Sequence, residues 1–279
     1  METCLLNYFI VGTELRSTCD FNPNLHKEGR GIYEVSRVIN GIPLFLNEHI
    51  DRFYNSAEIG NIGLNINRNQ LLRMFQSLIE VNHLKNGNIQ FQFIERKNSG
   101  KHFTAWITPT IYPTEKDYTE GVQIATLNAV RNLPNLKSVN LPTRQKANQF
   151  ISEKEIFEVL LIDDEGLVTE GSRSNIFFVK DNKLVTTNLE LVLPGITRSK
   201  VIEIAFSENI DLHTTRIPFA ELDNFDAAFL TSTSMNILPV NKIDQLKFDA
   251  KNSLVTQLSR LYNQRIEKDL NSFKWPSIT

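Results

Sequence analysis

The stretch that decides the fold is Val168-Thr169-Glu170-Gly171-Ser172-Arg173-Ser174-Asn175-Ile176-Phe177. Apolar and β-branched residues stand at both of its ends, and a Gly-Ser-Arg-Ser segment stands between them, which predicts a strand, a turn and a second strand. Glu170 is placed where the first strand ends. Taken alone, it is equally well an ordinary turn residue, so its meaning depends on the segments around it.

Outward from this stretch, two more segments stand out, one around a lysine and one at an expected helix start. Lys137, within Asn135-Leu136-Lys137-Ser138-Val139-Asn140, lies 33 residues before Glu170. Leu193-Pro194-Gly195-Ile196-Thr197-Arg198 follows Glu170 and is predicted to open a helix, whose N-terminal N–H groups can bind phosphate. Each segment alone has a plain interpretation, a surface lysine and a Pro-Gly turn.

Two more segments lie further out. Leu230-Thr231-Ser232-Thr233-Ser234-Met235-Asn236 is a hydroxyl-rich loop between expected strands. Asn47-Glu48-His49-Ile50-Asp51-Arg52 begins an expected helix that would place Arg52 on its surface. The order and spacing of all five segments are more informative than any one of them.

Together these segments resemble class IV (fold type IV) pyridoxal-phosphate enzymes: branched-chain aminotransferases, D-amino acid aminotransferases and aminodeoxychorismate lyases. The resemblance extends from about Gly31 to Val240 in colinear order. It implies an α+β enzyme of two domains, a smaller N-terminal α/β sandwich and a larger C-terminal β-barrel-like domain with helices. It also implies pyridoxal 5'-phosphate as cofactor and a homodimer.

The resemblance assigns the cofactor-binding residues one by one. Lys137 matches the catalytic lysine, which links covalently to the cofactor and moves the proton at the substrate Cα. Glu170 matches the carboxylate that faces the pyridine nitrogen. The remaining matches are the phosphate-binding Arg52, Ile196, Thr197 and Thr233, and Leu193, which packs on the ring face. Asn175 is expected to fix the turn after Glu170.

The resemblance also assigns substrate-binding positions: Tyr33, Arg37, His102, Arg173, Ser234 and Met235. Arg37 agrees with the branched-chain and lyase patterns. His102 agrees with the D-specific pattern, but the arginine of the D-specific carboxylate site is replaced by Gly100, with Lys101 adjacent. For Arg173, contact with a carboxylate and exposure to solvent are equally open.

One departure weakens the branched-chain pattern. The tyrosine that those enzymes carry five residues after the lysine is replaced by Pro142. The leading interpretation is nevertheless an aminotransferase acting on L-amino acids with branched-chain or similar apolar side chains and on 2-keto acids. The alternatives are an aminodeoxychorismate lyase, a D-amino acid aminotransferase, and a non-catalytic α+β binding protein.

Composition restricts the partners. Of the 279 residues, 41% are hydrophobic and 22% charged, with 30 Lys plus Arg against 32 Asp plus Glu. This balance lacks the basic excess that nucleic-acid binding needs, so we expect small-molecule substrates and no nucleic acid or membrane as partners. Cys4 and Cys19 form no metal-ligand pattern, and we expect no metal. With no basic segment before the first apolar residues, no signal peptide is predicted, and we expect a cytoplasmic protein.

Periodicity predicts the elements. Asn40-Gly41 between apolar runs predicts a hairpin over residues 31–45. Helices are expected from a cap at Asn47, over 67–84, over 144–156, after 194–195 and over 252–270. Strands are expected at 88–94, where polar and apolar faces alternate, and, after a turn at 98–100, at 103–108. Further strands are expected at 122–130, 157–162, 167–169, 175–179 and 227–231.

The polar segment 111–121 is predicted to be an interdomain linker, because few of its residues suit a core. The expected domains are therefore an N-terminal α+β domain, residues 1–118, and a C-terminal cofactor-binding domain, residues 119–279.

Overall fold

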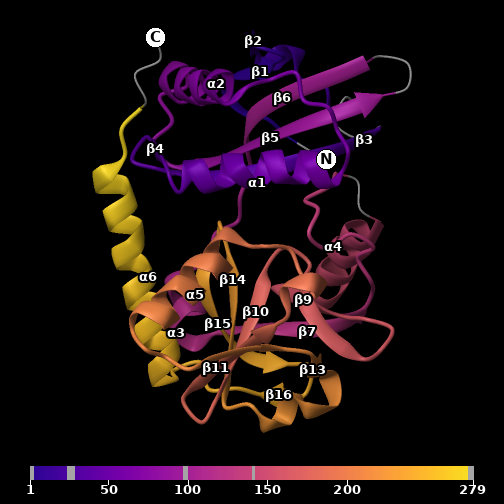
Figure 1. Ribbon diagram of the computed structural model, residues 1–279, viewed down its shortest axis with the longest axis vertical. Helices are drawn as coiled ribbons and strands as arrows, with labels where there is room; N and C mark the ends of the chain where they lie inside the picture. The colour runs from indigo at the N-terminus through magenta and orange to yellow at the C-terminus, as the bar shows by residue number, and fades with distance from the viewer. Residues whose placement is uncertain (1–2, 24–28, 97–99, 140–141, 276–279) are drawn as a thin grey trace. The chain divides into compact units, whose positions relative to one another are not determined.

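The computed structural model describes residues 3–23, 29–96, 100–139 and 142–275 (Figure 1). The chain divides into two compact units. The N-terminal unit consists of Met1–Ile111, Leu136–Asn140 and Ile266–Thr279, and the C-terminal unit of Tyr112–Asn135 and Leu141–Arg265. The first division falls inside the predicted linker. A single boundary at 118/119 leaves out the two later segments that join the N-terminal unit.

The N-terminal unit contains a six-stranded sheet of order β2-β1-β6-β5-β3-β4. All of its pairings are antiparallel, as expected from the alternating sequence. Its elements are β1 (Leu5–Val11), β2 (Glu14–Ser17), a 3-10 turn (Thr18–Asp20), β3 (Arg30–Ile39), β4 (Ile42–Pro43), α1 (Leu46–Ile59), α2 (Arg68–Val81), β5 (Gly87–Arg96) and β6 (Gly100–Thr108).

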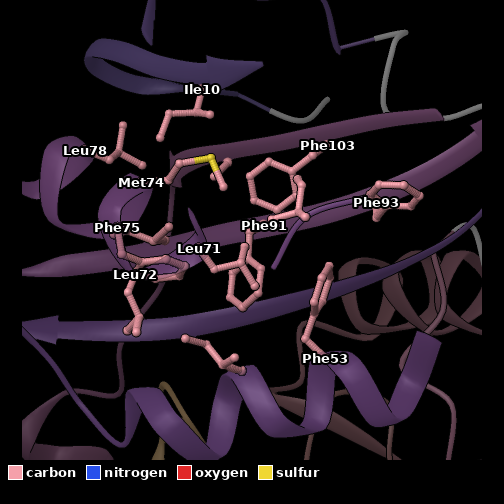
Figure 2. Packing of buried hydrophobic residues seen from close by; sticks show 14 of the residues in the cluster. Ile10, Phe53, Leu71, Leu72, Met74, Phe75, Leu78, Phe91, Phe93 and Phe103 are labelled. Atoms are coloured by element: carbon pink, nitrogen blue, oxygen red, sulfur yellow. The ribbon is translucent and has the colours of Figure 1, made fainter. Parts of the chain in front are cut away.

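Helices α1 and α2 cover one face of this sheet, as Figure 2 shows. The ring centroid of Phe91 on β5 lies 4.9 Å from Phe53 of α1 and 4.9 Å from Phe75 of α2. Phe103 on β6 extends this aromatic layer. Burial of these large apolar side chains is the main favourable contribution to the folding of this unit.

The predicted hairpin is confirmed, and so is the second helix. Asn40 and Gly41 both have positive φ, 52° and 79°, as a two-residue turn between twisted strands requires. Asn67 caps α2 through a capping box with Gln70. Of the predicted turn at 98–100, residues 98 and 99 lie outside the described residues.

One expectation for this unit is wrong. Asn47 does not cap α1, because the helix already begins at Leu46 after Phe45, which adopts the left-handed conformation. The Phe45 N–H instead donates to Asp269 Oδ2 at 2.8 Å. The alternating strand forms as expected, and two of its polar residues, Asn88 and Gln92, are each only 1% exposed.

The C-terminal unit contains a ten-stranded mixed sheet of order β12-β11-β10-β14-β15-β7-β8-β9-β13, with β16 paired to β15. Its strands are β7 (Val122–Asn128), β8 (Glu158–Ile162), β9 (Leu167–Gly171), β10 (Asn175–Lys180), β11 (Lys183–Thr187), β12 (Leu212–Thr215), β13 (Ile217–Pro218), β14 (Ala227–Ser232), β15 (Asn236–Ile243) and β16 (Leu246–Lys247). Its helices are α3 (Glu115–Glu120), α4 (Pro142–Lys154), α5 (Ile196–Ser207), the 3-10 turns Leu189–Leu191 and Phe219–Asn224, and α6 (Ser253–Ser272), which ends in the N-terminal unit.

This sheet curls back upon itself. Strand β9, near one end of the order, contacts β10 and β11, near the other end. The Thr187 hydroxyl on β11 donates to the Val168 carbonyl on β9 at 3.2 Å. The curled sheet agrees with the barrel-like domain that the resemblance implies.

The predicted linker is not free of structure. Residues 115–120 form α3, which begins with a capping box between Thr114 and Asp117. Tyr118 packs against the core of the C-terminal unit, and its hydroxyl donates to the Met235 carbonyl at 3.0 Å. The Asn241 side chain of β15 also donates to the Glu120 carbonyl at 2.8 Å. The polar sequence concealed this helix because Tyr118 is its one aromatic residue. Among the described residues, no helix is long and apolar enough to cross a membrane.

Candidate active site

Lys137 is attached to the edge of strand β3. The Tyr33 N–H donates to the Lys137 carbonyl at 3.0 Å, the Val139 N–H donates to the Gly31 carbonyl at 3.0 Å, and Ser138 forms an isolated bridge with Ile32. The Lys137 Nζ lies 4.6 Å from the centroid of the Tyr33 ring. Main-chain pairing therefore holds the lysine, and its half-buried amine lies over an aromatic face.

Arg52 is buried on α1 and is bound to a carboxylate. Its Nε and one terminal nitrogen donate to the two oxygens of Glu34, each at 2.7 Å. His49, one turn earlier on α1, places Nδ1 3.2 Å from Glu34 Oε1. Sequence reasoning did not identify Glu34 or His49 as part of this cluster.

Burial and neighbouring charges set the charges of this cluster. Burial alone would raise the pKa of Glu34, but the Arg52 guanidinium and His49 hold that pKa far below its usual range. Burial lowers the pKa of His49, and its contact with Glu34 offsets this only in part. The cluster therefore consists of a carboxylate, a guanidinium and a neutral imidazole.

The expected substrate residues of the N-terminal unit share one face of the sheet. Tyr33 and Arg37 are four residues apart on β3, so their side chains point the same way. His102 lies directly opposite Ile94, which lies directly opposite Gly31, so His102 belongs to the same face. This face is the one opposite α1 and α2, and the Lys137 amine lies over it at Tyr33.

Lys101, by contrast, is held near the start of β6, opposite Glu95 of β5. Its Nζ lies 3.0 Å from Glu95 Oε1 and donates to the Gly63 carbonyl at 2.8 Å. Glu95 also pairs with Arg30 at 3.0 Å. These contacts direct Lys101 away from the position of a missing arginine.

Glu170 ends β9 and is 2% exposed. Arg131 donates to its Oε1, and the pair is largely buried, with side-chain exposures of 12% and 3%. The Leu193 N–H donates to Glu170 Oε2 at 2.9 Å. These contacts fix the direction of the carboxylate, and the Arg131 charge favours its ionised form, which suits a group that must keep a ring nitrogen protonated.

Asn175 joins the Glu170 strand to the start of α5. Its Nδ2 donates to the Leu193 carbonyl at 3.0 Å and to Glu170 Oε2 at 3.3 Å. A Cβ on Gly195 would lie 2.0 Å from Asn175 Oδ1, so glycine is needed there. The structure thus gives Asn175 the turn-fixing part expected of it.

The first turn of α5 fits an anion. Gly195 is its N-cap and supplies no side-chain acceptor, and the first turn has no acidic residue. Ile196 and Thr197 are buried there, and the Thr197 hydroxyl lies 3.3 Å from the Tyr262 hydroxyl of α6. Arg198 is also buried; burial lowers its pKa and nearby Glu170 partly restores it.

Arg173 binds this chain's own groups. Its Nε lies 3.4 Å from Glu158 Oε2, and one terminal nitrogen donates to the Phe157 carbonyl at 2.8 Å. Glu158 is fully buried and also accepts from the Ser172 hydroxyl at 2.6 Å and the Ser174 hydroxyl at 3.3 Å. These contacts stabilise the turn after Glu170, and the substrate-binding part of Arg173 stays a prediction.

The hydroxyl-rich loop connects β14 to β15. Thr233 and Ser234 are half-buried between these strands. Met235 is 4% exposed and belongs to the hydrophobic core of the C-terminal unit. The substrate-binding parts of Ser234 and Met235 stay predictions.

The predicted residues form two sets, one in each unit. The N-terminal unit gathers Lys137 and Tyr33, with Arg52 bound to Glu34. The C-terminal unit gathers Glu170 and Leu193, with Thr197 at the start of α5. Each set by itself suits one part of an anionic pyridine cofactor: the N-terminal unit offers an amine and a guanidinium, and the C-terminal unit offers a carboxylate and a helix start without a side-chain cap.

Comparison with known sequences identifies the family of this chain. A sequence profile described as "Amino-transferase class IV" matches residues 31–243. The chain belongs to this family. A D-alanine aminotransferase of Bacillus licheniformis is 35% identical to this class IV aminotransferase over 82% of the chain and 85% of the relative. An aminodeoxychorismate lyase of Bacillus subtilis is 27% identical over 86% of each chain.

Solved structures confirm the expected fold of this class IV aminotransferase. The branched-chain amino acid aminotransferase of Escherichia coli superposes with a TM-score of 0.82, over 97% of this chain and 98% of its own, at 18% identity. Another branched-chain amino acid aminotransferase, solved with pyridoxamine 5'-phosphate, superposes with a TM-score of 0.84 over 98% of each chain, at 22% identity. Identities this low are evidence for the fold alone. The expected two-domain α+β architecture is thereby confirmed.

Proposed function

We propose that this class IV aminotransferase binds pyridoxal phosphate and transfers an amino group from an L-amino acid with an apolar side chain to a 2-keto acid. The cofactor would be held by Lys137 and Arg52 of the N-terminal unit and by Glu170, Leu193, Ile196, Thr197 and Thr233 of the C-terminal unit. When bound, it supplies an electron-accepting ring. The protein residues supply the charges and the proton transfers.

Lys137 is the proposed catalytic residue. Its amine is the nucleophile that holds the cofactor and the base that removes and returns the proton at the substrate Cα. The main-chain attachment to β3 keeps the amine in one place during both steps. Glu170, ionised and fixed by Arg131 and Leu193, keeps a proton on the ring nitrogen.

One observation supports the proposed preference for L-amino acids. The D-specific pattern binds the substrate carboxylate with an arginine that this chain replaces with Gly100. Lys101 is the nearest cation in sequence, but it is bound to Glu95 and to the Gly63 carbonyl. A lysine held in this way does not replace the arginine. Arg37, on the same sheet face as Tyr33, is the proposed partner of the substrate.

A second candidate is a D-amino acid aminotransferase. It is supported by the 35% identity to the D-alanine aminotransferase of Bacillus licheniformis and by His102 on the same face as Tyr33. The lyase alternative shares its first proton transfer with amino transfer, so cofactor-binding residues do not separate the two.

Single-turnover reactions with L-leucine, L-valine, D-alanine, D-glutamate and aminodeoxychorismate test the proposal. Loss of the visible absorption of the lysine-bound cofactor should be fastest with L-leucine or L-valine. Faster conversion of D-alanine would overturn the L preference. Pyruvate release from aminodeoxychorismate without amino transfer would favour the lyase. Lys101→Met should leave the KM for every donor unchanged, because Lys101 is bound to Glu95 and to the Gly63 carbonyl.

Two further expectations belong to this proposal. A homodimer would complete the active site, as the resemblance implies, and sedimentation at several protein concentrations measures it. A cytoplasmic location is supported by Cys4 and Cys19, which are both free thiols. Fractionation of the cells that express the protein would test the location.

A further inference from the structure

A carboxylate lies in the apolar layer between β3 and α1. Glu34 is 0% exposed, and its neighbours on the same side of β3 are Ile32, Ser36 and Val38, which are 0 to 1% exposed. Moving a carboxylate from water into such a layer is costly unless a cation compensates its charge. A buried charge at a core position therefore requires a structural or functional reason.

Both oxygens of Glu34 are occupied. Arg52 Nε donates to Oε2, and Arg52 Nη2 and the Val35 N–H donate to Oε1, at 2.7 to 2.8 Å. This paired contact uses one edge of the guanidinium and fixes both its plane and the direction of its Nη1 end. Arg52 is itself 9% exposed, so the whole group is set in the interior.

The groups around Glu34 favour its pairing with Arg52. His49 on α1 lies 3.2 Å from Glu34 and, being buried, has a lowered pKa and stays neutral. The Lys137 amine is close enough to lower the pKa of His49 as well. The titratable and charged groups that act on Glu34 are Arg52 and His49, and Lys137 acts on His49. Among the described residues, Arg52 is the one that makes a paired, charge-assisted contact with Glu34.

We propose that Glu34 is a positioning residue for phosphate recognition: it holds the Arg52 guanidinium in the one orientation in which it binds the cofactor phosphate. This inference rests on the proposed phosphate-binding role of Arg52. An arginine side chain without a fixed partner has many rotamers, and ordering it at the moment of binding costs affinity. Glu34 orders it beforehand, in the folded chain.

The test compares two aldehydes that differ only in the phosphate. Dissociation constants for pyridoxal phosphate and for pyridoxal are measured on the cofactor-depleted protein, and their ratio gives the phosphate preference. Arg52→Ala should lower this preference by roughly ten- to a hundredfold. Glu34→Gln should lower it by about tenfold, because the amide holds the guanidinium less firmly. In the double variant, adding Glu34→Gln to Arg52→Ala should not lower the phosphate preference further.

Control variants separate positioning from charge and from folding. Glu58→Gln removes an exposed carboxylate from the same helix and should leave the preference unchanged. Arg52→Lys keeps the positive charge but loses the two-point contact, so it should lower the preference even though Glu34 is intact. Arg52→Lys also tests the inference by itself if Glu34→Gln does not fold.

Each outcome decides between the two proposals. An unchanged preference in Arg52→Ala would refute the phosphate role of Arg52, and the inference with it. A lowered preference in Arg52→Ala together with a wild-type preference in Glu34→Gln would refute the inference alone. A wild-type preference in Arg52→Lys would also refute it, because charge without orientation would then suffice.

Discussion

Replacing Glu170 with glutamine should destabilise the C-terminal unit even in the absence of cofactor. The substitution removes the charge that compensates Arg131, and the two side chains are only 3% and 12% exposed. Breaking a buried ion pair from one side costs about 3–5 kcal/mol. The new amide group would also turn an N–H towards either Arg131 or the Leu193 N–H, which now donates at 2.9 Å.

We expect a loss of unfolding free energy at the lower end of this range, because the Arg131 side chain is 12% exposed and keeps some contact with water. About 3 kcal/mol corresponds to a fall in the unfolding midpoint of roughly 6–12 °C for a protein of this size. The assay is thermal unfolding of cofactor-free protein, followed by circular dichroism. Replacing both partners, Glu170→Leu with Arg131→Met, should recover part of the loss, because the Arg131 charge is then removed together with its partner, while the Leu193 N–H still loses its acceptor.

A matched control is available in the same unit. Glu165 pairs with Arg216 at 3.4 Å, with side-chain exposures of 71% and 55%. Glu165→Gln is the same chemical change in a solvated pair and should cost only about 0–1 kcal/mol. Equal midpoints for the Glu165 and Glu170 variants would refute the argument that burial makes the Arg131–Glu170 pair structurally important.

The remaining predictions concern three other positions. Lys137→Ala should abolish the borohydride-reducible link to the cofactor and nearly all turnover; a normal adduct at another lysine, found by peptide mapping, would contradict this assignment. Burial lowers the pKa of His49, so the unfolded chain binds more protons than the folded chain, and the free energy of unfolding should fall as the pH drops below about 6.5. Urea midpoints measured at two pH values should show a smaller fall for His49→Asn than for the unchanged protein. Gly195→Ala should cost about 1–3 kcal/mol in thermal unfolding, since its Cβ would lie 2.0 Å from Asn175 Oδ1. Gly63→Ala, whose Cβ would lie 2.9 Å from the Nζ of the solvent-exposed Lys101 side chain, should cost clearly less, and equal losses would show that close approach to Asn175 is unimportant.

Local signals predicted many of the elements. Asn40-Gly41 specifies its turn through two residues that tolerate positive φ, and Asn67 specifies a helix start through its own side chain. Such signals lie within a few residues of the structure that they determine. Strand β1 has no comparable signal, because its pairing partner β6 is distant in the sequence and its own side chains are largely exposed.

The same distinction applies to the candidate site. Lys137, Glu170 and Thr197 belong to short motifs, so they could be placed from sequence. Glu34 carried a weaker signal, a charge on the apolar side of a β-branched strand, which should have prompted a search for a buried cation.

Arg131 carried no such signal. It lies in an irregular loop and meets Glu170 across 39 positions of sequence. Ion pairs of this kind depend on the folded arrangement of distant segments, which neither periodicity nor local spacing encodes.

The main-chain attachment of Lys137 to β3 has a consequence for hydrogen exchange. The Tyr33 and Val139 amides donate across this junction, and both acceptors are carbonyl groups. Their exchange with deuterated water therefore reports how often the lysine segment detaches from the strand, whichever substrate the enzyme uses. Protection at these two amides should persist in Lys137→Ala, since the attachment involves no side chain of that residue. Loss of protection there would show that the amine itself holds its segment in place.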